Sequence, residues 1–225
     1  MILNIETATT NCSVSLAQNG LVVSFKEYAN EQYSHSEQLH LFIAEVLTQA
    51  NKSLSDLSAI AVSKGPGSYT GLRIGVSAAK GLCYALNIPL ISVSTLKCLA
   101  LPFKPLKGQL AVPMLDARRM EVYMAGFDHE MEQLLPTTAT VIEPHSLLDL
   151  AKSYDQVHLI GSGADKVFEI SEANNLVAHG GALPSAKDMA QLSFERWKDK
   201  QFEDVAYFEP FYLKDFMAPL PKKRV

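Results

Sequence analysis

The stretch LSAIAVSKGPGSYTGLRIG, residues 57–75, combines a continuous apolar run, a glycine-rich turn and the start of a helical pattern. An apolar run without alternation is typical of a strand that is buried on both faces of a sheet. Gly65, Gly67 and Gly71 can adopt backbone conformations that other residues avoid, and Pro66 stiffens the turn. The stretch therefore predicts a strand–turn–helix unit of an α/β protein.

This turn is also a candidate phosphate loop, made of Gly65, Gly67, Ser68, Gly71 and Arg73. The free N–H groups and positive dipole end of a helix N-terminus favour an anion. A cation in the first helical turn is locally unfavourable, so Arg73 needs a reason to be there. The loop lacks the Gly-Lys-Ser/Thr of a Walker P-loop. Taken alone, it favours the alternative of a tight strand-to-helix connection, with Arg73 in solvent or paired with a carboxylate.

Upstream of this unit, MILNIETAT begins with an apolar strand that ends at Glu6–Thr7. Residues 12–29 form two alternating runs joined by Asn19–Gly20, a pair that favours a type I′ hairpin turn. Apolar spacing from Ser36 to Asn51 predicts an amphipathic helix. With the later strand PLISVS, these elements predict a mixed α/β layer.

The helix predicted over residues 71–86 is apolar on two sides. One stripe is large and the other is nearly all small: the first is Leu72, Val76, Ala79, Cys83 and Leu86, and the second is Ile74, Ala78, Gly81 and Ala85. Each stripe needs cover, and small residues let a second helix approach closely. Either the domain covers both stripes or a partner chain covers one, and the sequence leaves both alternatives open.

Composition changes at LPFKPLKGQ, where prolines and a glycine indicate a linker. We therefore expect lobes at residues 1–105 and 106–225, with the C-terminal segment packing back on the first lobe. LAVPMLDARRMEVYMAGFD predicts two strands around a turn, and VHLIGSGADKVFEI predicts a strand, a glycine turn and a helix. SAKDMAQLSFERWKDKQ predicts an amphipathic helix with Ser185 as its N-cap. No internal repeat is evident.

The bulk composition narrows the class of protein. The chain has 225 residues, 48% hydrophobic and 20% charged, so a buried core is expected. A formal charge of -4 argues against a nucleic-acid footprint over the whole surface. The N-terminus has no basic n-region, and no apolar run is long enough for a membrane span. The odd number of cysteines, each in an apolar segment, favours reduced thiols and a cytoplasmic location.

Six blocks of the chain resemble the TsaB family, also described as YeaZ: ILNIETATTNCSVSL, HSEQLH, GPGSYTGLRIGVSAAKGL, IPLISVSTL, LDARRMEVY and EPFYLKD. These proteins are bacterial subunits of the tRNA threonylcarbamoyladenosine-forming complex. The resemblance is dense over residues 1–125 and thin over residues 126–205. It implies an α/β, actin-like ATPase fold (ribonuclease H-like) of two lobes, each a mixed sheet with flanking helices.

The resemblance implies a scaffold without catalytic residues, which pairs with the catalytic relative TsaD and the ATPase TsaE. That complex modifies the adenosine beside the anticodon in ANN-decoding tRNAs. TsaD has a His-x-x-x-His metal motif where this chain reads ISVSTLKCLA, and an Asp-Glu pair where it has Thr10 and Asn11. We therefore expect no metal or cofactor here, and ATP and metal on the partner subunits. His35 and His40 would lie about 140° apart on a helix, and the other histidines are scattered in the sequence: His129, His145, His158 and His179.

The family resemblance further implies that the helices at residues 36–51 and 71–86 pack against two helices of TsaD as a four-helix bundle. We expect partner contacts from Leu39, Phe42, Ile43, Val46, Leu72, Ile74, Gly75, Ala78, Ala79 and Leu82. In the chain alone, an exposed apolar stripe would pair with itself in a homodimer. The glycine loop would then be a vestigial phosphate loop. The tRNA would be reached through the complex, and no membrane is expected as a partner.

Secondary candidates are Glu6, Thr7, Asp116, Arg118, Gly161 and Gly163. LDARRMEVY, with Asp116 and Arg118, would contact tRNA or TsaE, and its alternative is a salt-bridged hairpin turn. GSGAD, residues 161–165, resembles the adenosine-side glycine turn of actin-like ATPases, and its alternative is a plain strand–helix turn. PKKRV at the end is interpreted as a solvated basic tail near RNA. The runner-up function is an ATP- or metal-dependent enzyme of the actin-like superfamily, a small-molecule kinase or a glycoprotease-like peptidase.

Overall fold

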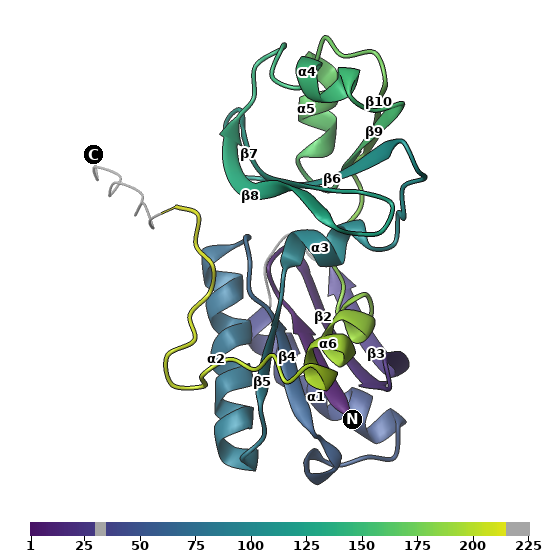
Figure 1. Ribbon diagram of the computed structural model, residues 1–225. Helices are drawn as coiled ribbons and strands as arrows, with labels where there is room; N and C mark the ends of the chain where they lie inside the picture. Colours follow the sequence, from purple (N-terminus) through teal and green to yellow (C-terminus); the bar gives the residue numbers. More distant parts are fainter. Residues whose placement is uncertain (30–34, 215–225) are drawn as a thin grey trace, which may run out of the picture.

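The computed structural model describes residues 1–29 and 35–214, which form two lobes with a five-stranded mixed sheet in each (Figure 1). Strand β1 lies at the centre of the first sheet, antiparallel to β2 and parallel to β4. The strand order across the sheet is β3 (Leu21–Ala29), β2 (Asn11–Gln18), β1 (Ile2–Glu6), β4 (Ala59–Ser63) and β5 (Leu90–Val93).

The second sheet repeats this topology. Strand β6 is central, antiparallel to β7 and parallel to β9. The order is β8 (Gln133–Val141), β7 (Glu121–Phe127), β6 (Gln109–Asp116), β9 (Gln156–Ile160) and β10 (Leu176–His179). Each lobe is thus a three-stranded antiparallel meander followed by two parallel strands. This doubled ribonuclease H-like arrangement confirms the predicted actin-like fold class. The repeat exists in topology, although none is evident in the sequence.

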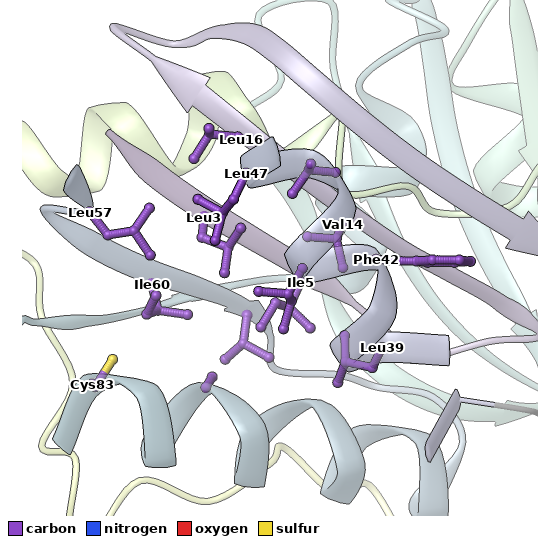
Figure 2. Packing of buried hydrophobic residues seen from close by; sticks show 14 of the residues in the cluster. Leu3, Ile5, Val14, Leu16, Leu39, Phe42, Leu47, Leu57, Ile60 and Cys83 are labelled. Atoms are coloured by element: carbon purple, nitrogen blue, oxygen red, sulfur yellow. The ribbon is translucent and has the colours of Figure 1, made fainter. Parts of the chain in front are cut away.

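Helices cover both faces of the first sheet. Helices α1 (His35–Gln49) and α2 (Tyr69–Leu86) cover one face, where Leu3, Ile5 and Ile60 of the sheet enter a shared core (Figure 2). The other face carries α6 (Met189–Lys198), whose Met189 packs with Ile91 and other residues of the alternate strand positions. Because α6 follows the second lobe in the sequence, the first lobe contains segments from both ends of the chain.

Shorter helices complete the two lobes: η1 (Leu54–Asp56), α3 (Thr95–Ala100), α4 (Leu148–Lys152) and α5 (Ala164–Ile170). The core of the second lobe joins its sheet to α4 and α5. Cys12, Cys83 and Cys98 are buried free thiols, as their apolar surroundings predicted. Within residues 1–29 and 35–214, every helix is too short or too polar to span a bilayer.

Two element predictions can be checked closely. The Asn19–Gly20 turn is confirmed, with φ of 51° and 80° at its two residues. The predicted start of the last helix at Ser185 is wrong, because α6 begins after Asp188. Ser185 is buried and its hydroxyl donates a hydrogen bond to Glu27 Oε2 over 2.6 Å, so it cannot cap the helix.

Residues 199–214, which we call the C-terminal strap, run from α6 across β5 and α2 and then toward the second lobe (Figure 1). The Glu203 N–H donates to the Leu90 carbonyl over 2.9 Å, and the Phe211 N–H to the Lys64 carbonyl over 2.7 Å. The strap ends at Lys214, which forms an ion pair with the β7 carboxylate Glu121. The basic tail PKKRV that follows lies outside the described residues.

Candidate functional site: the glycine turn and the exposed face of α2

The glycine turn between β4 and α2 is filled by the connection between β1 and β2. The Ser68 N–H donates to the Ala8 carbonyl over 2.7 Å, and the Thr7 hydroxyl donates to the Gly71 carbonyl over 2.8 Å. A Cβ at Gly67 would overlap the Ala8 carbonyl oxygen, and a Cβ at Gly71 would overlap that of Thr7. These two glycines therefore allow two segments of backbone to approach closely.

The N–H groups of Gly65, Ser68 and Gly71 already have partners within the chain. The Ser68 hydroxyl accepts a hydrogen bond from the Gly71 N–H at 3.2 Å and caps α2. The Gly65 N–H donates to the Thr95 hydroxyl over 3.1 Å, and the Gly65 carbonyl accepts from the Thr95 N–H. The residues of the candidate phosphate loop thus lie together, and these N–H groups hold the turn rather than facing an open anion site.

Arg73 has a local reason for its place in the first turns of α2. Its guanidinium is 4.2 Å from the centre of the Tyr69 ring, which is a cation–π contact. The Tyr69 ring in turn packs against Tyr212 of the C-terminal strap, with ring centres 4.9 Å apart. Arg73 is exposed, and its contact with Tyr69 explains its position without a bound phosphate.

Glu6 is fully buried at the end of β1. Its Oε1 accepts hydrogen bonds from the Ala8 N–H at 2.6 Å and from the Ser63 hydroxyl at 2.9 Å. Among the described residues its Oε2 has no hydrogen-bond partner. Burial outweighs the hydrogen bonds and raises the pKa of Glu6 to about 7. The carboxyl is therefore a core group that keeps its proton in mildly acidic solution and loses it as the pH rises through about 7.

No three side chains of His, Cys, Asp or Glu within residues 1–29 and 35–214 lie close enough to hold a metal ion. His35 is buried, with Nε2 2.7 Å from the Thr9 carbonyl oxygen, and His40 is exposed. The structure does bring together two histidines that are far apart in sequence. His158 Nδ1 lies 3.1 Å from His179 Nε2 across the parallel pair β9 and β10. Their spacing of 21 residues carries no signal of this contact.

The expected partner contacts on α1 need correction. Each of the α1 residues in that set is at most 5% exposed and packs in the core of its own lobe: Leu39, Phe42, Ile43 and Val46. On α2, Leu72, Gly75 and Ala79 are also buried. A Cβ at Gly75 would overlap the Thr7 hydroxyl. The sheet of the same chain covers these residues, so they have no surface to offer a second protein in this fold.

The exposed side of α2 is the small-residue stripe, which answers the question that the sequence left open. We call this surface the α2 face and define it by Ser77, Gly81, Tyr84 and Ala85, all exposed. It is flanked by half-buried side chains that were among the expected contacts: Ile74, Ala78 and Leu82. Tyr84 is 86% exposed, and a Cβ at Gly81 would meet no other atom within 4 Å.

The secondary glycines of the second lobe are packed against its sheet. Gly161 has φ of +106°, and a Cβ there would lie 2.6 Å from the Met114 carbonyl oxygen. A Cβ at Gly163 would lie 2.8 Å from Val122 Cγ1. These contacts favour the alternative of a strand–helix turn.

Of the charged secondary candidates at the β6–β7 turn, Asp116 is paired within the chain and Arg118 is exposed. Asp116 forms an ion pair with Lys166 over 2.5 Å, as in the salt-bridged alternative. Arg118 and Arg119 are exposed, and both have positive φ, of 69° and 53°.

Comparison with known proteins agrees with the fold. The family model TsaD, described as tRNA N6-adenosine threonylcarbamoyltransferase, matches residues 28–207. The tRNA threonylcarbamoyladenosine biosynthesis protein TsaB of Escherichia coli K12 is 30% identical over 223 residues, which cover 96% of each chain. The chain belongs to the TsaB family. The TsaB protein of Bacillus subtilis 168 is also 30% identical, over 95% of this chain and 93% of its own.

Membership of the TsaB family extends over both lobes. The solved structure "YeaZ from Pseudomonas aeruginosa" superposes with a TM-score of 0.82 at 26% identity, covering 94% of this chain and 99% of that one. A tRNA N6-adenosine threonylcarbamoyltransferase of Listeria welshimeri is 38% identical over 108 residues, which are 41% of this chain and 31% of its own. The chain therefore resembles TsaB proteins over its full length and a threonylcarbamoyltransferase over a part.

Proposed function

We propose that this TsaB-family chain is a non-catalytic scaffold in tRNA threonylcarbamoyladenosine biosynthesis, which pairs through its α2 face with a TsaD-type threonylcarbamoyltransferase. The pathway follows from the names of the full-length relatives. The observation that carries the pairing is the α2 face, an exposed stripe of small residues with a highly exposed tyrosine on an 18-residue helix. The site of action would be the cytoplasm.

The shape of the α2 face suits a helix of a partner. At Gly81 and Ala85 the helix backbone is covered by little or no side chain, so a second helix can approach closely. Tyr84 offers a large ring at low entropic cost, as the central residues of interfaces often do. A TsaD-type partner that resembles a part of this chain could present an equivalent helix, which would favour a pseudo-twofold contact. In the absence of the partner, a second copy of this chain would occupy the same face.

The glycine turn supports the non-catalytic part of the proposal. Its backbone is packed on Thr7 and Ala8, and its N–H groups hold the chain's own carbonyl and hydroxyl oxygens. Glu6 is buried beneath it with a raised pKa, a poor state for binding a cation. ATP and metal would then be held by the partners, the TsaD-type subunit and a TsaE-type ATPase.

The test is size-exclusion chromatography with light scattering on this chain, mixed with the TsaD of the same cell. A one-to-one complex is expected, and Gly81→Arg should weaken it at least tenfold, because a charged side chain would stand between the helices. The space around Gly81 is open, so the substitution does not disturb the core. The helix should even gain about 0.8 kcal/mol, since arginine forms helices better than glycine.

Gly181→Arg is the matched control, because a Cβ at Gly181 also meets no other atom within 4 Å. This control should leave the complex intact. A complex that survives Gly81→Arg unchanged would contradict the α2 face as the contact. The chain alone should show a dimer that Gly81→Arg converts to a monomer, and TsaE added to the mixture should increase the mass of the complex.

A further inference from the structure

The arginine turn, residues 117–120 between β6 and β7, is held in an uncommon backbone conformation. Arg118 and Arg119 have φ of 69° and 53°, a region that two consecutive residues usually occupy only as Asn or Gly. Lys166 holds the turn from below. Its Nζ donates to three acceptors: Asp116 Oδ1 at 2.5 Å, the Arg119 carbonyl at 2.9 Å and the Glu121 carbonyl at 2.8 Å. The turn is thus fixed without using either arginine side chain.

The carboxylates beside the turn are already paired with lysines. Asp116 forms an ion pair with Lys166, and Glu121 forms one with Lys214 of the strap. Arg118 and Arg119 are exposed, and within the described part of the chain neither makes an ion pair. The two guanidinium groups are therefore available to an anion from outside.

The C-terminal strap connects this turn to a further cation on the first lobe. Lys214 lies on Glu121, and two residues earlier Tyr212 packs against Tyr69. The Tyr69 ring also contacts the guanidinium group of Arg73. We call the resulting surface the basic strip and define it by Arg73, Arg118, Arg119 and Lys214. Within the strap, the exposed acid that is nearest in sequence to Lys214 is Glu209.

The sequence that follows the described residues is rich in cations. Residues 215–225 contain one acid, Asp215, and three cations: Lys222, Lys223 and Arg224. These residues follow Lys214 in the sequence, and Lys214 itself forms an ion pair with Glu121 of β7. On the described surface, Arg73, Arg118 and Arg119 are exposed cations in a chain whose formal net charge is -4. Such local contrast directs a polyanion to one surface rather than to the whole molecule.

We propose that the basic strip binds the phosphate backbone of RNA, with the arginine turn at its centre. The identity of the anion rests on the proposed function, in which the complex acts on a tRNA. Guanidinium groups bind phosphate through two parallel hydrogen bonds, which lysine cannot match. The turn fixes the backbone of these two adjacent arginines before RNA arrives, so little backbone entropy is lost on binding. The strip spans both lobes, which allows contact with more than one phosphate.

The test is the double variant Arg118→Asn/Arg119→Asn, since asparagine removes both charges and tolerates positive φ. The matched control is Lys104→Asn/Lys200→Asn, because these exposed lysines also have positive φ, of 34° and 54°. Fluorescence anisotropy of a labelled tRNA transcript is measured with the TsaD complex over a salt series. The double variant should bind about tenfold more weakly at low salt. Its slope of log K against log salt should fall by about 1.5, and the control should match the wild type.

Chromatography of the same variants separates this inference from the proposed function. The double variant should still form the TsaD complex, because Arg118 and Arg119 belong to the second lobe and neither is part of the α2 face. Loss of that complex would make the turn a protein contact, and equal tRNA binding by variant and wild type would remove its role altogether; either result overturns the inference. If the wild type forms no complex, the proposed function fails, and the anisotropy is repeated on the chain alone. There a variant-specific loss still supports the basic strip, and absence of tRNA binding overturns it.

Discussion

Gly65 and Gly161 have the same backbone angle, φ of +106°, at equivalent places in the two lobes. Gly65 comes shortly after β4, and Gly161 directly follows β9. In each sheet this is the strand that pairs in parallel with the central strand. A Cβ at Gly65 would lie 2.8 Å from the Phe211 carbonyl oxygen, and one at Gly161 would lie 2.6 Å from that of Met114. The repeated topology thus extends to a single backbone angle.

Gly161→Ala should lower the free energy of unfolding by about 2 kcal/mol or more, because alanine is strained at this φ and its methyl group overlaps backbone. Urea unfolding followed by circular dichroism measures the change. Gly81→Ala is the control, since Gly81 lies in a helix with open space around it. It should raise the free energy of unfolding by about 0.5–1 kcal/mol. Equal effects of the two substitutions would contradict the explanation that positive φ and close backbone contact require glycine at position 161.

Glu6→Gln should change how stability depends on pH. Burial raises the pKa of Glu6 from 4.5 to about 7, so the folded chain holds this proton more tightly than the unfolded chain. Its contribution to stability is therefore complete below pH 4.5 and is lost as pH rises through about 7. The glutamine oxygen can still accept from Ala8 and Ser63.

The measurement is the free energy of unfolding of both proteins in urea at about pH 5 and about pH 8. Between these conditions the wild type should lose about 2–3 kcal/mol more than Glu6→Gln. Parallel pH profiles for the two proteins would show that the Glu6 carboxyl is not protonated in the fold. Groups that titrate in both proteins cancel in this difference.

Lys166→Met should destabilise the second lobe by about 1–2 kcal/mol, because the lysine holds three acceptors around the arginine turn. Lys152→Met is the control. Lys152 also pairs with an aspartate, Asp149, but its side chain is 72% exposed. Exposed pairs contribute little, so the control should change the free energy of unfolding by less than about 0.5 kcal/mol. A difference too small to resolve in urea unfolding would remove the anchoring role of Lys166.

Lys80→Met should loosen the C-terminal strap without unfolding the first lobe. Lys80 Nζ donates to the Ala206 and Phe208 carbonyls, each over 3.0 Å. Hydrogen exchange followed by mass spectrometry should show faster exchange in residues 203–211 and unchanged exchange in β1 and β4. Lys26→Met, which removes a surface ion pair with Glu45, serves as control and should leave the strap unaffected. Unchanged exchange in the strap would show that its backbone contacts alone hold it.

Local sequence signals predicted those elements whose geometry depends on neighbouring residues. Asn19–Gly20 requires two positive φ angles and forms a hairpin turn wherever alternating strands flank it. The run at residues 57–75 contains its own strand, turn and N-cap, so it folds as expected. The order of such units predicted a mixed α/β layer, and the resemblance to the TsaB family implied the actin-like class, which the two sheets confirm.

Contacts between distant segments were not predictable in the same way. The apolar face of α1 looks identical in sequence whether a partner or the chain's own sheet covers it, and the sheet covers it. Ser185 has the residue type of a helix cap, but its hydroxyl donates a hydrogen bond to Glu27, 158 residues earlier in the sequence. Lys166 and Lys214 show no sign in sequence of their ion pairs at the β6–β7 turn.

The sequence by itself determined the local elements, the fold class and the apolar character of both sides of α2. Only the tertiary structure decided which side of α2 remains exposed, why the glycine turn is closed, and where the cations of the strap lie. Periodicity and turn chemistry act over a few residues, whereas burial and ion pairing depend on the position of segments that the chain brings together only when it folds.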